Sequence, residues 1–329
     1  MIADRIRHAL QTDTAAIVVT SFLLGAGLMA ALWGINQIAI MRCNADFALV
    51  SPLRRCGLPF TNQKKEYELF QDELKSWITA REQQGGLEHV SVYFRDLDNG
   101  PWFGIGEENF FAPASLLKVP IMMAILKEAQ TDPSLLDEKT VFSGALPNLQ
   151  NELDPQHTLT IGQSYSVKEL LEKMIIYSDN NSKELLKSWL QDRFPDRDII
   201  AETYENLGII QTADLDIQLT VKSYSSIFRT LYNASYLSPA MSQYALGLLS
   251  QVAFQQGIVA GLPHGIEAAH KFGVLNFLKL KQLHDCGIVY HPKTPYLVCI
   301  MTRGEELNAL AGVIQEISRR VFHEVDARN

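Results

Sequence analysis

Segments typical of β-strands occur at both ends of the main part of this chain, and the residues between them have a helical pattern. Two strand-like runs, residues 89–96 and 101–105, are joined by Asp98-Asn99-Gly100, a favourable tight-turn sequence. Three more such runs lie near the C-terminal end, at residues 267–274, 278–290 and 295–302. We therefore expect strands from both ends to share one antiparallel sheet.

Helices are expected to flank this sheet. Apolar residues recur at helical spacing from Tyr67 to Ile78, and this helix ends at Gly85-Gly86. A second amphipathic helix, residues 305–325, closes the chain. The predicted fold class is therefore α/β, of the α+β type. The predicted domain spans residues 63–329, with the sheet part at 63–112 and 255–329.

The inserted middle, residues 113–254, is predicted to be an all-helical subdomain. Its clearest helix covers residues 167–176, and loops are expected around residues 131–165 and 207–220. With 329 residues, of which 47% are hydrophobic and 20% charged, the chain is large enough to bury a full core.

Residues 15–41 contain no charged side chain. A helix of about 20 residues crosses the hydrocarbon of a bilayer, so this run predicts an N-terminal transmembrane anchor after a short tail, residues 1–14. A cleaved signal peptide is the alternative. Residues 42–62 are predicted to form a linker, in which Cys43 and Cys56 either close a disulfide loop or remain two thiols.

The net charge of -8 argues against a nucleic-acid partner, because phosphate contacts require clustered Lys and Arg. The eight His lack the spacing of metal ligands, and neither a metal nor a cofactor is predicted.

Ser115 and Lys118 lie three residues apart at the start of an apolar helical run. Positions i and i+3 share one helix face, so both side chains can point into one pocket. Burial beside a second cation would lower the pKa of the lysine and allow its neutral amine to accept the serine proton. An ordinary buried helix is the alternative, and this motif does not exclude it.

Two further motifs follow in order: Ser178-Asp179-Asn180 and His270-Lys271-Phe272-Gly273. Together with Ser115-x-x-Lys118 they resemble the S-x-x-K, S-D-N and K-T-G motifs of class A β-lactamases and penicillin-binding proteins. The similarity extends to residues 284–290 and 297–304 and covers roughly residues 66–325. By itself, the second motif would also fit a helix-capping turn.

The resemblance implies a role for each matching residue in acylation. Ser115 would attack a carbonyl and hold the acyl group as an ester, and Lys118 would take the serine proton. The backbone N–H groups of Ser115 and Val274 would stabilise the oxyanion.

Three side chains would handle the substrate and the leaving group. Ser178 would pass a proton to the leaving nitrogen, and Asn180 would hold a substrate amide and orient Lys118. Lys271 would raise the local potential for a substrate carboxylate.

Two departures from the family pattern bear on function. Phe272 replaces the hydroxyl that would precede Gly273 and help to bind the substrate carboxylate, which puts carboxylate recognition in doubt. Residues 207–220 are short and lack the E-x-x-x-N segment whose Glu activates water. Asp214 or Asp216 is either a surrogate base or a solvated loop acid. Losing a positioned base costs about 100- to 10,000-fold, so the acyl-enzyme is expected to persist.

Cys286 and Cys299 flank the turn at His291-Pro292-Lys293-Thr294. They would face each other across a hairpin, either as a disulfide or as two buried thiols.

The sequence thus predicts a single-pass protein of the cytoplasmic membrane with its domain outside the cytoplasm. Its function would be that of a serine hydrolase acting on β-lactams or on cell-wall peptides ending in D-alanine. One alternative is a slow D,D-carboxypeptidase that β-lactams inhibit. The other is an inactive domain that binds peptidoglycan or a protein partner.

Overall fold

The computed structural model describes Met29 and residues 48–51, 67–98, 100–144, 157–210, 217–276 and 279–328. Several predicted features lie outside these residues. They are the anchor apart from Met29, the pair Cys43 and Cys56, and the two loop acids Asp214 and Asp216. Among the described residues, no helix combines the length and apolar character that crossing a bilayer requires.

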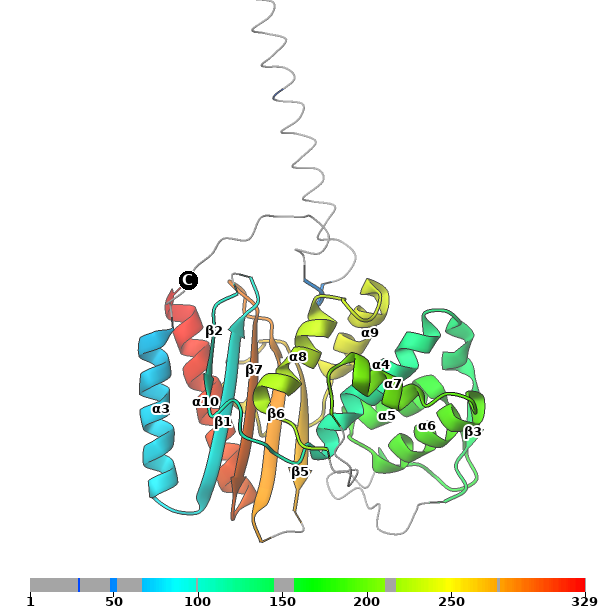
Figure 1. Cartoon of the computed structure of the whole chain (residues 1–329), viewed down its shortest axis with the longest axis horizontal. Helices are drawn as coiled ribbons and strands as arrows, with labels where there is room; N and C mark the ends of the chain where they lie inside the picture. Colours follow the sequence, from blue (N-terminus) through cyan, green and yellow to red (C-terminus); the bar gives the residue numbers. More distant parts are fainter. Residues whose placement is uncertain are drawn as a thin grey trace, which may run out of the picture. The chain divides into compact units, whose positions relative to one another are not determined.

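The core of the domain is a five-stranded antiparallel sheet (Figure 1). Its strand order is β2-β1-β7-β6-β5. The bounds are β1 (Leu87–Asp96), β2 (Trp102–Ile105), β5 (Ala268–Leu275), β6 (Lys281–Val289) and β7 (Tyr296–Gly304). Because β1 pairs with β7, the first and last strands of the chain meet in the middle of the sheet. The prediction that both ends of the chain share one antiparallel sheet is confirmed.

Two helices, α3 (Glu68–Gln83) and α10 (Leu307–Arg328), pack on one face of the sheet (Figure 1). The cluster between them includes Leu74, Val298 and Ile314, each at most 1% exposed. Burying one such side chain contributes about 1.5–3 kcal/mol. This apolar layer stabilises the sheet. The edge strand β5, at the other end of the strand order from β2, is thereby held in place to carry a site.

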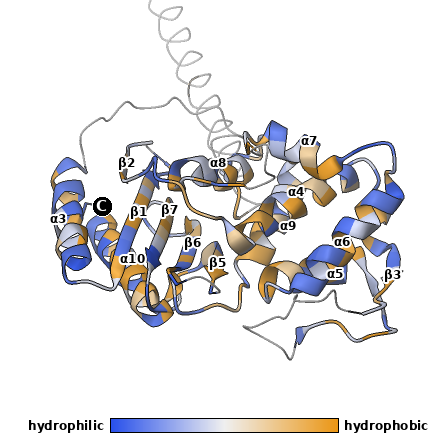
Figure 2. Cartoon of the chain, turned by 60° about the horizontal axis from the view of Figure 1, so that its bottom comes forward, coloured by the Kyte–Doolittle hydropathy of each residue, from blue (hydrophilic) through white to orange (hydrophobic). Residues whose placement is uncertain are grey.

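The middle of the chain contributes α4 (Lys118–Ala129), α5 (Val167–Ile176), α6 (Asn180–Arg193), α7 (Ile199–Asn206), α8 (Val221–Tyr232) and α9 (Pro239–Leu249). Helix α4 is buried continuously from Lys118 to Leu126 because α5, α7 and α9 all pack against it. In Figure 2 the hydrophobic colour is concentrated on α4, α9 and the sheet. Helix α8 packs on the sheet face opposite α10 and links the two parts.

The prediction of an all-helical insertion is wrong in one respect. Strands β3 (Lys139–Val141) and β4 (Ser164–Ser166) form a small antiparallel pair within it. The pair is extended by the Val167 N–H, which donates to Glu138 O at 2.9 Å. Pairing satisfies the backbone groups of both segments, and helical periodicity gives no signal for it. Ser166 then caps the N-terminus of α5 and forms a capping box with Glu169.

Leu49, Val50 and Ser51, within the predicted linker, pack against the domain and are each at most 7% exposed. The Ser51 N–H donates to Tyr232 O at 2.7 Å, and the Leu49 N–H donates to Gln243 Oε1 at 2.8 Å. These bonds attach the segment to the end of α8 and to α9.

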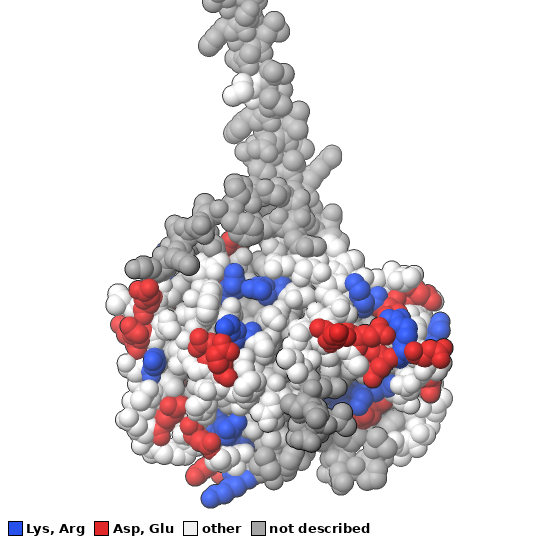
Figure 3. Space-filling view, in the orientation of Figure 1, with Lys and Arg blue, Asp and Glu red and all other residues white. Residues whose placement is uncertain are grey.

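Charged side chains are mixed on the face shown in Figure 3, where Lys and Arg lie among Asp and Glu. Some of the opposite charges on the surface form ion pairs, as Arg197 does with Glu128 and Glu202.

Candidate active site

The turn that carries Ser115 is a 3-10 helix, η1 (Ala114–Leu117), and α4 begins at Lys118. A 3-10 turn has three residues per turn, so side chains at i and i+3 eclipse each other. Lys118 Nζ therefore lies 3.0 Å from Ser115 Oγ, where it is placed to donate a hydrogen bond. Ala114 adopts a left-handed φ of 49°, a strained conformation that turns the chain sharply before Ser115.

Lys118 is the centre of the hydrogen-bond network. Besides Ser115, its amine donates to Asn180 Oδ1 at 2.8 Å, to Ser178 Oγ at 3.0 Å and to the Ser178 carbonyl. The side chain is only 1% exposed. The amine thus has four oxygen atoms within hydrogen-bond distance and at most three protons to donate. Its position is therefore fixed in both its protonated and its neutral form.

Ser178 lies between two lysine amines. Lys271 Nζ, from β5, donates to Ser178 Oγ at 2.9 Å on the side away from Lys118. The turn around Ser178 is fixed by Asp179, whose carboxylate caps α6 by accepting from the Ser182 N–H at 2.7 Å. Ser178 itself has a left-handed φ of 57°. The second motif is thus both a helix cap and part of the site.

The structure brings together five predicted residues from the three motifs: Ser115, Lys118, Ser178, Asn180 and Lys271. Strand β5 lies directly against η1 because Gly273 has no side chain. A Cβ at this position would lie 2.8 Å from Pro113 O and 3.1 Å from Leu116 Cγ. Glycine therefore allows a close approach that any other residue would prevent.

The amide of Val274 points toward the site edge of β5. This strand is the last of the sheet, so one of its edges has no strand partner. The Tyr290 N–H donates to Glu267 O, and the register continues without a bulge to Val274 opposite Leu283. Because bonded and non-bonded pairs alternate in an antiparallel ladder, Val274 is a non-bonded position. Its N–H faces away from β6, toward the edge that lies against η1.

Burial lowers the pKa of both amines, and like charge lowers that of Lys118 further. Burial has the largest effect on the Lys118 amine, followed by the positive charges of Lys271 and Lys183, and its pKa falls well below the ordinary value. Burial lowers the pKa of Lys271 to about 7 against the opposing attraction of Asp285. The second cation expected beside the first lysine is therefore Lys271.

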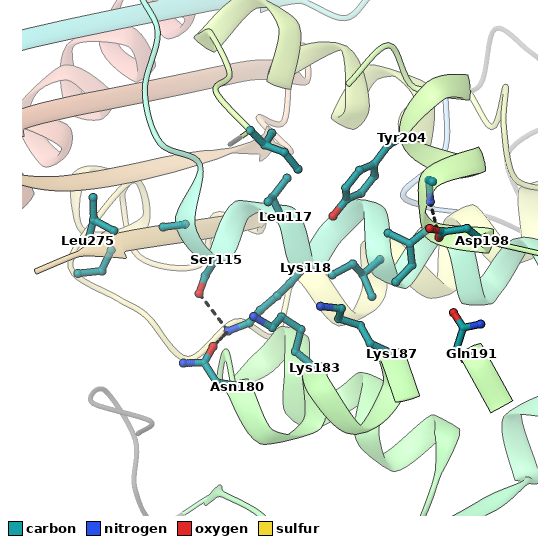
Figure 4. A pocket seen from close by; sticks show the side chains of 16 residues that line it. Ser115, Leu117, Lys118, Asn180, Lys183, Lys187, Gln191, Asp198, Tyr204 and Leu275 are labelled. Carbon is teal, nitrogen blue, oxygen red and sulfur yellow. Dashed lines mark hydrogen bonds between the residues drawn. The ribbon is translucent and has the colours of Figure 1, made fainter. Parts of the chain in front are cut away.

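A pocket of about 590 Å³ opens in front of Ser115 and is also lined by Lys118, Asn180 and Val274. Figure 4 shows Lys183 and Lys187 extending from α6 along it, with Asp198 on the side away from Ser115. Among the described lining residues, Asp198 is the only carboxylate, and it accepts from the Ala201 N–H at 2.9 Å.

Two lysines of this pocket were not predicted from the sequence. Lys183 and Lys187 follow Asn180 by three and seven residues, so helical periodicity from the S-D-N motif would have placed them on its face. Both amines contact Glu184, at 2.8 and 3.3 Å.

Phe272, which replaces the expected hydroxyl, is 3% exposed and stacks on Phe254 with ring centroids 4.3 Å apart. On the same strand, His270 Nδ1 lies 2.8 Å from Asp285 Oδ1, and the other carboxylate oxygen accepts from the Ile258 N–H. No motif points to Phe254 or to this buried pair.

Cys286 and Cys299 are register partners on β6 and β7 and form a disulfide. Of the two alternatives that the sequence left open, the structure contains the disulfide. Within the described part of the chain, no group of three or more His, Cys, Asp or Glu is arranged to hold a metal ion.

The sequence profile of the beta-lactamase enzyme family matches residues 69–325, and the chain belongs to this family. The resemblance inferred from the motifs is thereby confirmed. Comparison with curated proteins gave no match.

Solved structures of the same fold include both penicillin-binding proteins and β-lactamases. A mutant of PBP-A, in its acyl-enzyme complex with penicillin G, has a TM-score of 0.66 and 20% identity over 82% of this chain and 100% of that chain. The TLA-1 extended-spectrum β-lactamase gives 0.66 and 19%, over 77% and 98%. A β-lactamase from Chitinophaga pinensis gives 0.66 and 20%, over 80% and 100%. At these identities the likeness shows the fold.

Proposed function

We propose that this protein is a serine hydrolase that is acylated at Ser115 by β-lactams or by D-alanyl cell-wall peptides, and that it releases the acyl group slowly. The observation that carries the proposal is the contact between Lys118 Nζ and Ser115 Oγ at 3.0 Å, inside a network that also holds Ser178 and Asn180. A nucleophile, a base and an orienting group within hydrogen-bond reach are the signature of covalent catalysis.

Acylation follows from this geometry in three proton transfers. Ser115 Oγ attacks the carbonyl carbon, and its proton passes to the neutral amine of Lys118. The oxyanion accepts hydrogen bonds from the N–H groups of Ser115 and Val274, which are preorganised at η1 and at the edge of β5. As the carbon–nitrogen bond breaks, Ser178 gives its proton to the leaving nitrogen and takes one from Lys118. The product is an ester on Ser115, together with an amine that stays attached to the opened β-lactam or leaves as D-alanine from a peptide.

The low pKa values of the two lysines support this assignment. An amine with an ordinary pKa is protonated at pH 7 and is no base. Burial and the mutual proximity of Lys118 and Lys271 increase the neutral fraction of Lys118. Asn180 Oδ1 accepts from the Lys118 amine and so directs its lone pair toward Ser115.

Slow release follows from the acids that line the pocket. Hydrolysis of the ester requires a base that activates water, and Asp198, the only carboxylate in the described lining, already caps α7. Without a free carboxylate among the described lining residues, we expect a deacylation rate lower by about 100- to 10,000-fold. This favours a penicillin-binding protein or a slow D,D-carboxypeptidase over a fast β-lactamase.

The test is intact mass of the full-length protein after exposure to penicillin G, followed over time beside Ser115→Ala. We expect an adduct of one penicillin that requires Ser115 and persists for minutes or longer. An adduct that decays within seconds would indicate a working β-lactamase with Asp214 or Asp216 as its base. The absence of any adduct would contradict acylation by penicillin and favour an inactive binding domain.

For location, the proposal places the domain outside the cytoplasm, anchored by residues 15–41. The uncharged run supports an anchor, and the disulfide Cys286–Cys299 supports an oxidising compartment. Protease added to spheroplasts, in which the outer envelope is removed and the cytoplasmic membrane is intact, should digest the domain while a cytoplasmic control protein survives. A domain that is protected until the cells are lysed and the compartments opened would contradict this placement.

A further inference from the structure

A second cavity, of about 290 Å³, adjoins the two residues that would deliver the proton to the leaving group. Its walls are residues 176–177, residues 253–256 and Phe272. Tyr177 precedes Ser178, and Phe272 follows Lys271, so the cavity begins beside the hydrogen bond between Ser178 and Lys271. The Ala253 N–H donates to Ile176 O at 2.9 Å and joins the two sides.

The cavity wall is aromatic and uncharged. The rings of Phe254 and Phe272 stack at 4.3 Å with an interplanar angle of 23°. Across the cavity, Tyr177 stacks on His157 with ring centroids 4.0 Å apart. No charged side chain occurs in the described lining, and the polar groups there are the amides of Gln255 and Gln256 and the Tyr177 hydroxyl.

Lys271, the nearest cation, is already engaged. Its amine donates to Ser178 Oγ at 2.9 Å and to Phe272 O at 3.2 Å. It lies 4.0 Å from the centroid of the Phe272 ring, and its side chain is fully buried. Burial lowers its pKa to about 7, so a large fraction of the amine is neutral near physiological pH. A carboxylate in the cavity would therefore meet no free donor cation.

We propose that this cavity is the subsite for the leaving-group side of the substrate, and that it prefers an uncharged amide or ester there, so that the free carboxylate of a penicillin or of a terminal D-alanine slows acylation without preventing it. The inference rests on the proposed function, because Ser178 must protonate the leaving nitrogen for the groups attached to that nitrogen to enter the cavity. Phe272 is the specificity-determining residue. Its ring fills the position next to Lys271 and packs against Phe254, and the two glutamine amides supply hydrogen bonds for a neutral polar group.

Two probes that differ only in charge test the proposal: penicillin G and its methyl ester. The acylation rate of the full-length native protein is measured with each by intact mass, and each rate is divided by the rate at which hydroxide opens the same probe. This normalisation removes the difference in intrinsic reactivity. We expect the ester to be favoured by about tenfold or more, because a carboxylate placed against the aromatic wall loses part of its hydration and finds no charged partner in the described lining.

Phe272→Thr and Phe272→Leu form a matched pair of variants. The threonine removes the ring and adds a hydroxyl, so the preference should shift at least about tenfold toward the carboxylate form. The leucine removes the ring but stays apolar and should keep the preference for the ester. Melting temperatures establish that both variants are folded, and the native ratio tests the proposal without any variant.

The outcomes separate this inference from the function on which it rests. If the native protein is acylated by the acid as fast as by the ester, or faster, the neutral subsite is overturned while acylation at Ser115 stands. A ratio that Phe272→Thr leaves unchanged overturns the role of Phe272. If neither probe forms an adduct, the proposed function fails and the inference fails with it.

Discussion

Replacing Gly273 with alanine tests whether the contact between β5 and the serine turn controls the reaction. The added Cβ would lie 2.8 Å from Pro113 O and 3.1 Å from Leu116 Cγ, whereas ordinary Cβ contacts begin near 3.4 Å. The Pro113 carbonyl is backbone and cannot rotate away, so β5 and η1 must separate by about half an ångström. Overpacking of this kind costs about 1–3 kcal/mol.

The same displacement moves the Val274 N–H relative to Ser115. A misplacement of about 1 Å costs roughly 100-fold in rate, so half of that predicts an acylation rate about tenfold lower. Acylation by penicillin G is followed by intact mass, and stability by thermal unfolding. The expected decrease in melting temperature is about 2–10 °C.

Gly247→Ala in α9 and Gly312→Ala in α10 are matched controls, because an added Cβ meets no atom within 4 Å at either position. Alanine in an open helical position stabilises by about 0.5–1 kcal/mol and should leave acylation unchanged. The reasoning would be refuted if Gly273→Ala acylated at the native rate with an unchanged melting temperature.

Three further predictions concern the surroundings of the site. The acylation rate should rise with pH and level off at a pH below the usual lysine range, because Lys118 acts as a neutral base and burial with nearby positive charge lowers its pKa; a flat profile would argue against Lys118. Asp285→Ala should lower the free energy of unfolding by about 3–5 kcal/mol, because it leaves His270 and the Ile258 N–H buried without their partner. Urea unfolding measures this change, and a loss below about 1 kcal/mol would contradict the prediction. Tyr224→Phe removes the hydroxyl that donates to Leu116 O at 2.9 Å and should cost about 1 kcal/mol, so an unchanged urea midpoint would show that the bond does not stabilise the serine turn.

The sequence could predict those parts of the site in which chemistry and spacing are local. Ser115 and Lys118 are three residues apart, and this separation places two side chains together in an α-helix and also in the 3-10 turn that forms. The S-D-N turn is equally local, because Asp179 caps the helix that Asn180 begins. Strand patterns at both ends of the chain were enough to predict a shared sheet, since alternation and turn residues are visible within ten residues.

Features that depend on strand register could not be predicted in this way. His270 meets Asp285 only because Lys271 pairs with Cys286, and a shift of one residue would turn Asp285 to the other face of the sheet. The stack of Phe254 on Phe272 joins a loop to a strand, with no periodic signal between them. The same holds for Leu49–Ser51, whose attachment depends on the far ends of α8 and α9.

In the proposed mechanism, the pocket supports formation and hydrolysis of the Ser115 ester unequally. Among the described lining residues other than Lys118, two lysines, Lys183 and Lys187, outnumber the one carboxylate, Asp198, and this favours the anionic intermediates of acylation and of deacylation alike. The two steps therefore differ in their bases and not in the field. Acylation has Lys118, which is rigidly held between Ser115 and Asn180. Deacylation would need a carboxylate above the ester, and Lys183 and Lys187 instead pair with Glu184, while Asp198 holds the start of α7. In the proposed mechanism the acylating groups sit on η1, β5 and the start of α6, whereas the described part of residues 207–220 contributes Ile217 to the pocket lining and Leu219 as a backbone partner of Phe111. Acylation can therefore be retained in a chain that lacks the water-activating loop.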